Sequence, residues 1–157
     1  MALISMVAGT VLVSGCGYQY GHMGAGSMPT SFSSNGERIY YTGTSKRNTE
    51  ISFTGGGMHV QMMGGSCVSC HGTDRRGNIR MMPFFWETAP PLTAEALFDS
   101  HGEKSDGHGE HDNYNDATLR RAINSAIDPS GRGLDDLMPR WRMTGEDMDD
   151  LIAFLKS

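Results

Sequence analysis

The feature that most constrains this chain is a single C-x-x-C-H box, formed by Cys67, Cys70 and His71. Two thiols three positions apart can each form a thioether with one vinyl group of a haem. The adjacent imidazole then lies close enough to the iron to ligate it. The box therefore predicts one covalently attached c-type haem, with His71 as the proximal ligand.

A bare C-x-x-C also occurs in zinc half-sites and in thioredoxin-like dithiols. A zinc site needs a second pair of ligands, and Cys16 is the only other cysteine. A redox dithiol needs a β-α-β context, whereas glycine, serine and threonine flank this box. The immediate His71 therefore favours haem over both alternatives.

Composition agrees with a cofactor-containing domain. A chain of 157 residues is one domain by size, and its 21 glycines and 8% aromatic residues leave a thin apolar core that a haem would complete. The net charge of −5 argues against a nucleic-acid partner. It fits a protein that meets its redox donor and acceptor electrostatically.

The first 15 residues carry no charged side chain and have the apolar composition of a secretory signal core, although no lysine or arginine precedes it. The run is too short to span a bilayer as a helix. It ends in Val13-Ser14-Gly15-Cys16, which resembles the lipobox of bacterial lipoproteins. That resemblance implies a lipidated Cys16 anchored to the membrane. The alternative is a cleaved signal with Cys16 merely nearby, and both place the domain outside the cytoplasm.

Residues 17–35 are rich in glycine, serine and tyrosine and show no hydrophobic periodicity, which is typical of a flexible tether. The expected organisation is therefore a signal peptide at 1–15, a lipidated cysteine and tether at 16–35, and a folded domain at 36–157. The sequence contains no internal repeat and no second C-x-x-C-H box.

A short stretch at 36–41 is compatible with a helix capped by Ser34 or Asn35. Here the chain resembles the small bacterial cytochromes c, whose N-terminal helix carries a Gly-x-x-x-aromatic pattern and crosses the C-terminal helix at the glycine. Gly36 and Tyr40 match that pattern. The resemblance implies an all-α domain whose helices wrap around one haem. It also implies that an aromatic residue of the last helix, Phe154, meets Tyr40.

Residues 42–66 depart from the family, because compact members run almost directly from the first helix into the box. This insert alternates apolar and polar residues around three glycines at 55–57. The alternation permits a hairpin, but residues 58–63 equally fit a helical turn leading into the box.

After the box, residues 72–89 are expected to be irregular, and Pro90 and Leu92 then match a Pro-x-Leu pattern that lies against the haem in cytochromes c. The resemblance implies that the Pro90 carbonyl accepts the Nδ1–H of His71, which would fix the imidazole tautomer and raise its basicity. The alternative is a proline-rich loop end before a helix capped by Thr93.

The chain has 12 methionines, most of which must fill the core. In the cytochrome c family the distal ligand lies on a loop shortly before the C-terminal helix, often as Met-Pro. Met138, followed by proline, matches, so the resemblance implies His71 and Met138 as the axial ligands. Met82 also precedes a proline but follows His71 too closely to wrap the haem edge. Met143 is the other alternative.

Two helices should frame the Met138 loop. One is expected at 116–126, capped by Asn115, and the last begins at the N-cap Thr144 with apolar residues at helical spacing.

Between the Pro-x-Leu and these helices lies a polar cluster that could bind copper, zinc or calcium, or respond to pH. The favoured alternative is a solvated loop. The cluster comprises His101, Glu103, Asp106, His108, Glu110, His111 and Asp112.

These features predict an electron carrier and not an enzyme. With both axial positions filled, no substrate reaches the iron, and single electrons pass through the exposed haem edge. One alternative is a cytochrome subunit of a larger oxidoreductase. The other is a haem sensor or enzyme whose distal ligand is displaceable.

Overall fold

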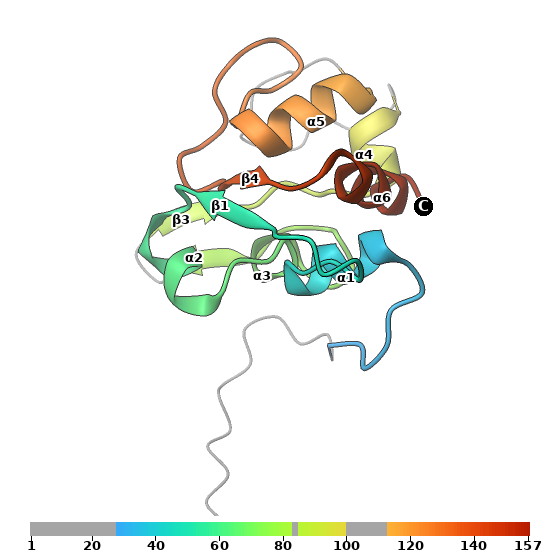
Figure 1. Ribbon diagram of the computed structural model, residues 1–157. Coiled ribbons are helices and arrows are strands. Elements are labelled where there is room, and N and C mark those ends of the chain that lie inside the picture. The colour runs from blue at the N-terminus through green and yellow to red at the C-terminus, as the bar shows by residue number, and fades with distance from the viewer. Residues whose placement is uncertain (1–27, 83–84, 100–112) are drawn as a thin grey trace, which may run out of the picture.

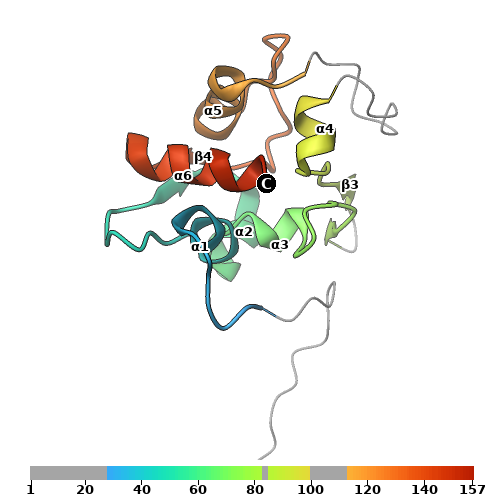
Figure 2. The same cartoon turned by 90° about the vertical axis from the view of Figure 1, so that its right-hand side faces the viewer.

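The computed structural model describes residues 28–82, 85–99 and 113–157. Figures 1 and 2 show α1, α2 and α3 in one layer, with β4 and α6 above it and α5 above these. The elements, in chain order, are α1 (Asn35–Thr42), β1 (Ser52–Thr54), α2 (Gly57–Met63), α3 (Val68–His71), β2 (Arg80–Met82), β3 (Phe85–Thr88), α4 (Ala94–Phe98), α5 (Asp116–Ser125), β4 (Arg140–Arg142) and α6 (Gly145–Leu155).

The packing of α1 against α6 follows the predicted pattern. A Cβ added to Gly36 would lie 1.9 Å from the carbonyl oxygen of Asp150, so the two helices cross where only a glycine fits. The rings of Tyr40 and Phe154 lie 5.4 Å apart, centroid to centroid, which confirms the expected aromatic contact. Tyr40 is fully buried between the helices.

The helix boundaries are set by the local capping residues that the sequence indicates. Ser34 caps α1, Thr93 caps α4 and Thr144 caps α6, each accepting a backbone N–H of the first turn on its side-chain oxygen. Asn115 and Thr118 form a reciprocal capping box at the start of α5. The predicted first helix and the two helices around the Met138 loop are thus confirmed.

The expectation of an all-α domain is corrected in part, because the described residues also form two small antiparallel sheets. One joins β1 to β4 and the other joins β2 to β3. The insert therefore forms no hairpin of its own: β1 pairs with β4, and residues 57–63 form α2. The β1–β4 pair is held by Phe53 opposite Trp141, whose rings lie 5.1 Å apart. Residues 72–89 are likewise not wholly irregular, since they contain β2 and β3.

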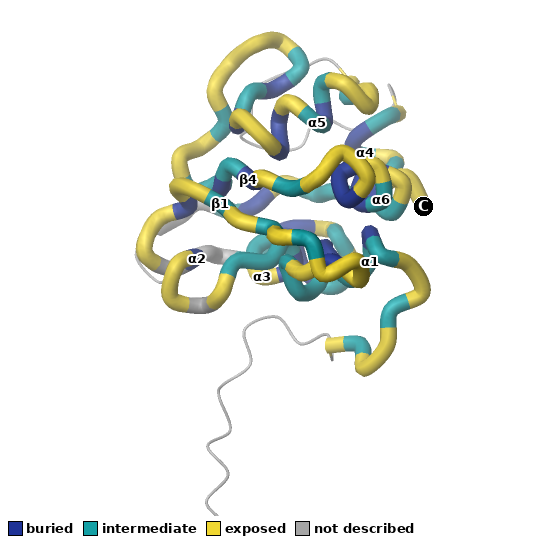
Figure 3. Tube along the Cα trace, in the orientation of Figure 1, coloured by how far each residue is buried: buried dark blue, intermediate teal, exposed yellow. Residues whose placement is uncertain are grey.

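The hydrophobic core lies between α1, α3, α5 and α6, and Figure 3 shows buried positions along these helices. The last helix contributes one continuous apolar face, which matches the helical spacing seen in its sequence. Its fully buried hydrophobic residues are Met148, Leu151, Ile152 and Leu155.

One carboxylate, Asp147, lies inside this packing with no exposed surface. It accepts hydrogen bonds from Ser45 Oγ at 2.6 Å, from Asn35 Nδ2 at 2.9 Å and from Thr49 Oγ1. The Arg47 guanidinium also contacts it at 3.1 Å. The start of α1 and residues 45–49 are thereby bound to the first turn of α6.

Several predicted features lie outside the described residues: the signal at 1–15, Cys16 with most of the tether, and the whole polar cluster at 101–112. The described end of the tether, 28–34, forms no helix or strand before Asn35. Across 28–82, 85–99 and 113–157, no helix combines the length and the hydrophobicity needed to cross a bilayer.

Candidate functional site

The C-x-x-C-H box occupies one short helix, α3, with Cys67 at its N-cap. The amide of His71 donates to the carbonyl of Cys67 at 2.9 Å, which closes one turn. Cys67 and Cys70 are free, partly exposed thiols on this turn. Burial raises the pKa of Cys67 to about 12 and also raises the pKa of Cys70. Both thiols are therefore protonated, unlike the low-pKa nucleophile of a redox dithiol.

The imidazole of His71 is buried and fixed by one hydrogen bond. Its exposure is 6%, and its Nδ1 lies 2.8 Å from the carbonyl oxygen of Pro90. Burial lowers the pKa of His71, and the hydrogen bond to Pro90 opposes that shift. Because the carbonyl can only accept, Nδ1 carries the proton and Nε2 is the ring nitrogen available to a metal. The predicted contact between Pro90 and His71 is present.

The Pro90 segment is held against the loop that follows the box. The amide of Asn78 donates to the Ala89 carbonyl at 3.1 Å, and the amide of Leu92 donates to the Arg75 carbonyl at 2.7 Å. Within the same loop, the Gly77 amide donates to the His71 carbonyl at 2.9 Å. These backbone bonds fix where the proline carbonyl meets the imidazole.

The first helix holds the other side of that loop through two tyrosines. The hydroxyl of Tyr40 donates to the Gly72 carbonyl at 2.6 Å, and the hydroxyl of Tyr41 donates to the Thr73 carbonyl at 2.7 Å. Burial raises the pKa of both tyrosines, so both stay neutral donors. The α1–α6 pair thus positions the box as well as forming the core.

Arg75 is a site-supporting residue that the sequence interpretation missed. Its guanidinium donates to the carbonyls of Phe154 at 2.7 Å and Ser157 at 2.8 Å, and it lies 4.9 Å from the centre of the Phe154 ring. It thereby joins the loop after the box to the end of α6. In sequence it stands among other charged residues, where a solvated side chain is the ordinary expectation.

Leu92 and Met138 are both half-buried and pack against the same hydrophobic cluster as the half-buried Cys67. Met138 lies just before β4, and its amide donates to the Asp135 carbonyl at 2.9 Å, which closes a turn. The predicted loop before the last helix therefore exists, and the fold brings its methionine onto the cluster that the box also contacts.

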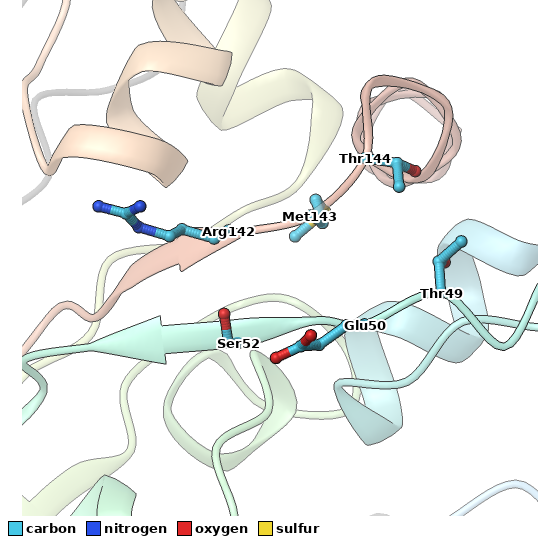
Figure 4. A pocket seen from close by; sticks show the side chains of 6 residues that line it. All are labelled: Thr49, Glu50, Ser52, Arg142, Met143 and Thr144. Carbon is cyan, nitrogen blue, oxygen red and sulfur yellow. The ribbon is translucent and has the colours of Figure 1, made fainter.

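The two alternative methionines are placed differently. Met82 ends β2, and its side chain lies outside the described structure. Met143 follows β4, packs on the same hydrophobic cluster as Met138 and lines a pocket at the end of the β1–β4 pair where Ser52 lies opposite Arg142 (Figure 4). No residue of the box takes part in that pocket, which is lined by Thr49, Glu50, Ser52, Arg142, Met143 and Thr144.

The structural context of the box also differs from the zinc and dithiol alternatives. The helix that carries it is preceded by α2 and not by a strand, so the β-α-β context of a thioredoxin-like motif is missing there. In the three described ranges, no three His, Cys, Asp or Glu side chains converge as a metal-binding group would require. The polar cluster at 101–112 lies outside those ranges.

A comparison with protein families gives one match. The family model described as Cytochrome c matches residues 57–157, which is more than half of the chain and includes the box, the Pro-x-Leu segment and the Met138 loop. Neither the curated proteins nor the solved structures include a match to this chain.

Proposed function

The chain belongs to the cytochrome c family, and from this we propose that it carries a single haem with His71 and Met138 as axial ligands and serves as an electron carrier outside the cytoplasm. Family membership means a covalently bound haem c and electron transfer through haem iron. The number of haems, the distal ligand and the attachment to a membrane are our proposals.

The buried His71 bonded to the Pro90 carbonyl is the observation that carries the proposal. This bond orients the ring, selects the Nδ1–H tautomer and leaves Nε2 as the nitrogen that would ligate the iron. Cys67 and Cys70, on the same helical turn, would form the two thioethers. The haem supplies one-electron chemistry between Fe(II) and Fe(III). The residues present therefore fit the group that the family requires.

Three observations support Met138 as the distal ligand. It lies on the loop before the last helix, it is followed by a buried proline, and it packs on the cluster that Cys67 contacts. Met143 packs on the same cluster, but it follows β4, has no proline after it and also lines a pocket with polar residues of the insert. A neutral thioether favours Fe(II), so His/Met ligation suits a carrier of relatively high potential.

With His71 and Met138 as axial ligands, neither water nor substrate would have access to the iron, and the chain would exchange single electrons with protein partners. The acidic net charge of −5 favours partners with a basic docking surface. An electron carrier works best when its structure changes little between the two redox states. The His71 imidazole and the Met138 thioether are both held by buried neighbours, which limits such changes.

The proposal extends to a membrane anchor through a lipidated Cys16, with residues 17–35 as the tether that lets the domain reach more than one partner. Covalent haem attachment and a lipoprotein signal both belong outside the cytoplasm, so the two features of the sequence agree. The described domain contributes no membrane-spanning helix of its own.

Replacing the distal ligand tests the function directly. Met138→Ala should remove the weak charge-transfer band of thioether-ligated Fe(III) and open the iron to cyanide or carbon monoxide. The reduction potential should fall by on the order of 0.1 V, a modest part of the roughly 0.8 V that axial ligands span. Absorption spectroscopy, ligand titration and voltammetry of the purified holoprotein measure these changes.

Met143→Ala and Met82→Ala are the matched controls and should leave the band in place. If Met82→Ala abolishes the band while Met138→Ala retains it, the loop assignment is wrong. If the parent protein has high-spin iron without the band, the chain is not a simple electron carrier. A haem sensor or enzyme with an open coordination site then becomes the better hypothesis for its function.

A further inference from the structure

The insert before the haem box contains three consecutive glycines, and the middle one is buried against the loop of the proposed distal ligand. Gly56 has φ of 79°, in the left-handed region, and is buried. A Cβ added to it would lie 2.8 Å from Pro139 Cγ and 3.1 Å from Val60 Cγ2. Real Cβ atoms do not approach that closely, so any side chain at this position must displace the proline or the valine.

Further contacts join the same glycine turn to the residues on either side of Met138. The amide of Gly56 donates to the carbonyl of Asp136 at 3.3 Å. A Cβ added to Gly57 would lie 3.4 Å from Leu137 Cδ2. The turn therefore touches positions 136, 137 and 139, which bracket the methionine within the chain.

The strand just before the glycines holds the end of the same loop. Thr54 lies opposite Arg140, and Phe53 lies opposite Trp141 in the β1–β4 pair. Trp141 is buried, with 4% exposure, and its ring packs on Phe53. Residues 136–142 are thus held along their length by the insert, from the turn at 55–57 back to β1.

We propose that Gly56 is a positioning residue for Met138, and that the insert as a whole is the support that sets the distal ligand. Because Gly56 has no side chain, Pro139 packs directly against the backbone of the insert. This packing fixes the position of the neighbouring Met138 thioether. A neutral thioether is a weak axial ligand, so a displacement of its loop by a fraction of an ångström weakens the bond to iron. This inference rests on the proposed His71/Met138 ligation.

The test compares Gly56→Ala with Gly55→Ala in the holoprotein. Gly55 has the same φ of 79°, but a Cβ there would meet only the end of the flexible Arg140 side chain, at 3.3 Å. The control therefore carries the same backbone strain without the collision with Pro139. Gly56→Ala should lose most of the thioether charge-transfer band and bind imidazole at the iron at least tenfold more tightly. Gly55→Ala should stay within about twofold of the parent.

A second pair of variants gives a result even if Gly56→Ala yields little folded protein. Pro139→Ala removes the Cγ that rests on Gly56 and should raise imidazole affinity severalfold by loosening the loop. In the Pro139→Ala background, Gly56→Ala should then add less than it does in the parent, because the collision with Pro139 is gone and only the contact with Val60 remains. Equal effects of the two glycine variants, or parent-like imidazole binding by Pro139→Ala, would overturn the positioning role.

The outcome separates this inference from the ligation on which it rests. If Met138→Ala leaves the band intact, the ligation fails whatever the glycine variants do. If Met138→Ala abolishes the band and Gly56→Ala retains it with unchanged imidazole affinity, the ligation stands and only the role of the insert is refuted.

Discussion

At the scale of single residues, the site is built from a few atoms with fixed partners. The Pro90 carbonyl holds Nδ1 of His71, and the tyrosine hydroxyls of α1 hold the carbonyls that follow the box. Backbone carbonyls therefore fix both the imidazole, through Pro90, and the loop that follows the box, through Gly72 and Thr73. The two cysteines differ from these partners because their proposed bonds to the haem are covalent thioethers.

Covalent attachment is testable at those cysteines. The double variant Cys67→Ala/Cys70→Ala should release its haem into acidified acetone, whereas the parent retains it, because only the two thioethers resist that extraction. Each single variant should still retain haem through the remaining thioether. Ser69→Ala, at the exposed position between them, is the control and should behave as the parent. Extraction of haem from the parent would show that the box has been misread.

At the scale of elements, the sequence predicts what depends on neighbouring residues. The caps Asn115 and Thr144 locate α5 and α6 because a side-chain oxygen serves an amide within the same turn. The box is likewise local, and its motif predicts where the haem is attached. Resemblance adds the Gly36 crossing and the Pro90 contact, which composition and spacing alone leave open.

Elements that are stabilised by residues far away in the sequence cannot be predicted from local patterns in this way. The alternation at 51–54 is visible, but nothing near it reveals that β1 pairs with β4, far along the chain. The glycines at 55–57 are recognisable as a turn in the sequence. The close packing of Pro139 against Gly56, however, forms only when the chain folds. Arg75 is similar, because its acceptors lie at the C-terminus.

The junction between α1 and α6 should depend strongly on one buried carboxylate. Asp147→Asn keeps the size of the side chain but removes the charge that several donors share, so the free energy of unfolding should fall by about 2 kcal/mol near neutral pH. Asp149→Asn, which removes an exposed carboxylate paired with Arg120, is the control and should cost less than about 1 kcal/mol. Urea titration of both holoproteins measures the difference, and equal values would contradict a special role for Asp147.

The same carboxylate predicts an acid dependence. Burial raises the pKa of Asp147, but hydrogen bonds from Ser45, Thr49, Thr144 and Asn35 outweigh it and hold the pKa below its ordinary value. The folded state therefore binds fewer protons at this site than the unfolded state does. The resulting stability is present above about pH 4, the unfolded pKa, and is lost as the pH falls toward the folded pKa. The parent should lose stability more steeply below that pH than Asp147→Asn.

At the scale of the whole molecule, the folded domain proposed for 36–157 and the segment before it are proposed to have different roles. The described residues pack around an α1–α6 core, while the segment before them combines an apolar start, a lipobox-like cysteine and a polar stretch. A tethered domain keeps a high local concentration near membrane partners and still rotates to present its haem edge. We propose that the anchor is the lipid on Cys16.

Fractionation of cells tests the anchor. Cys16→Ser should move the holoprotein from the membrane fraction to the soluble fraction, because lipid chains are the proposed membrane-binding element once the signal is removed. The haem spectrum should be unchanged, since the substitution lies outside the folded domain proposed for 36–157. Ser14→Ala, two residues earlier, is the control and should stay in the membrane. Retention of Cys16→Ser in the membrane would point instead to an uncleaved signal or to a bound partner. Washing the membranes with high salt distinguishes these two explanations. A partner held by charge is released by salt, whereas a signal inserted in the bilayer is not.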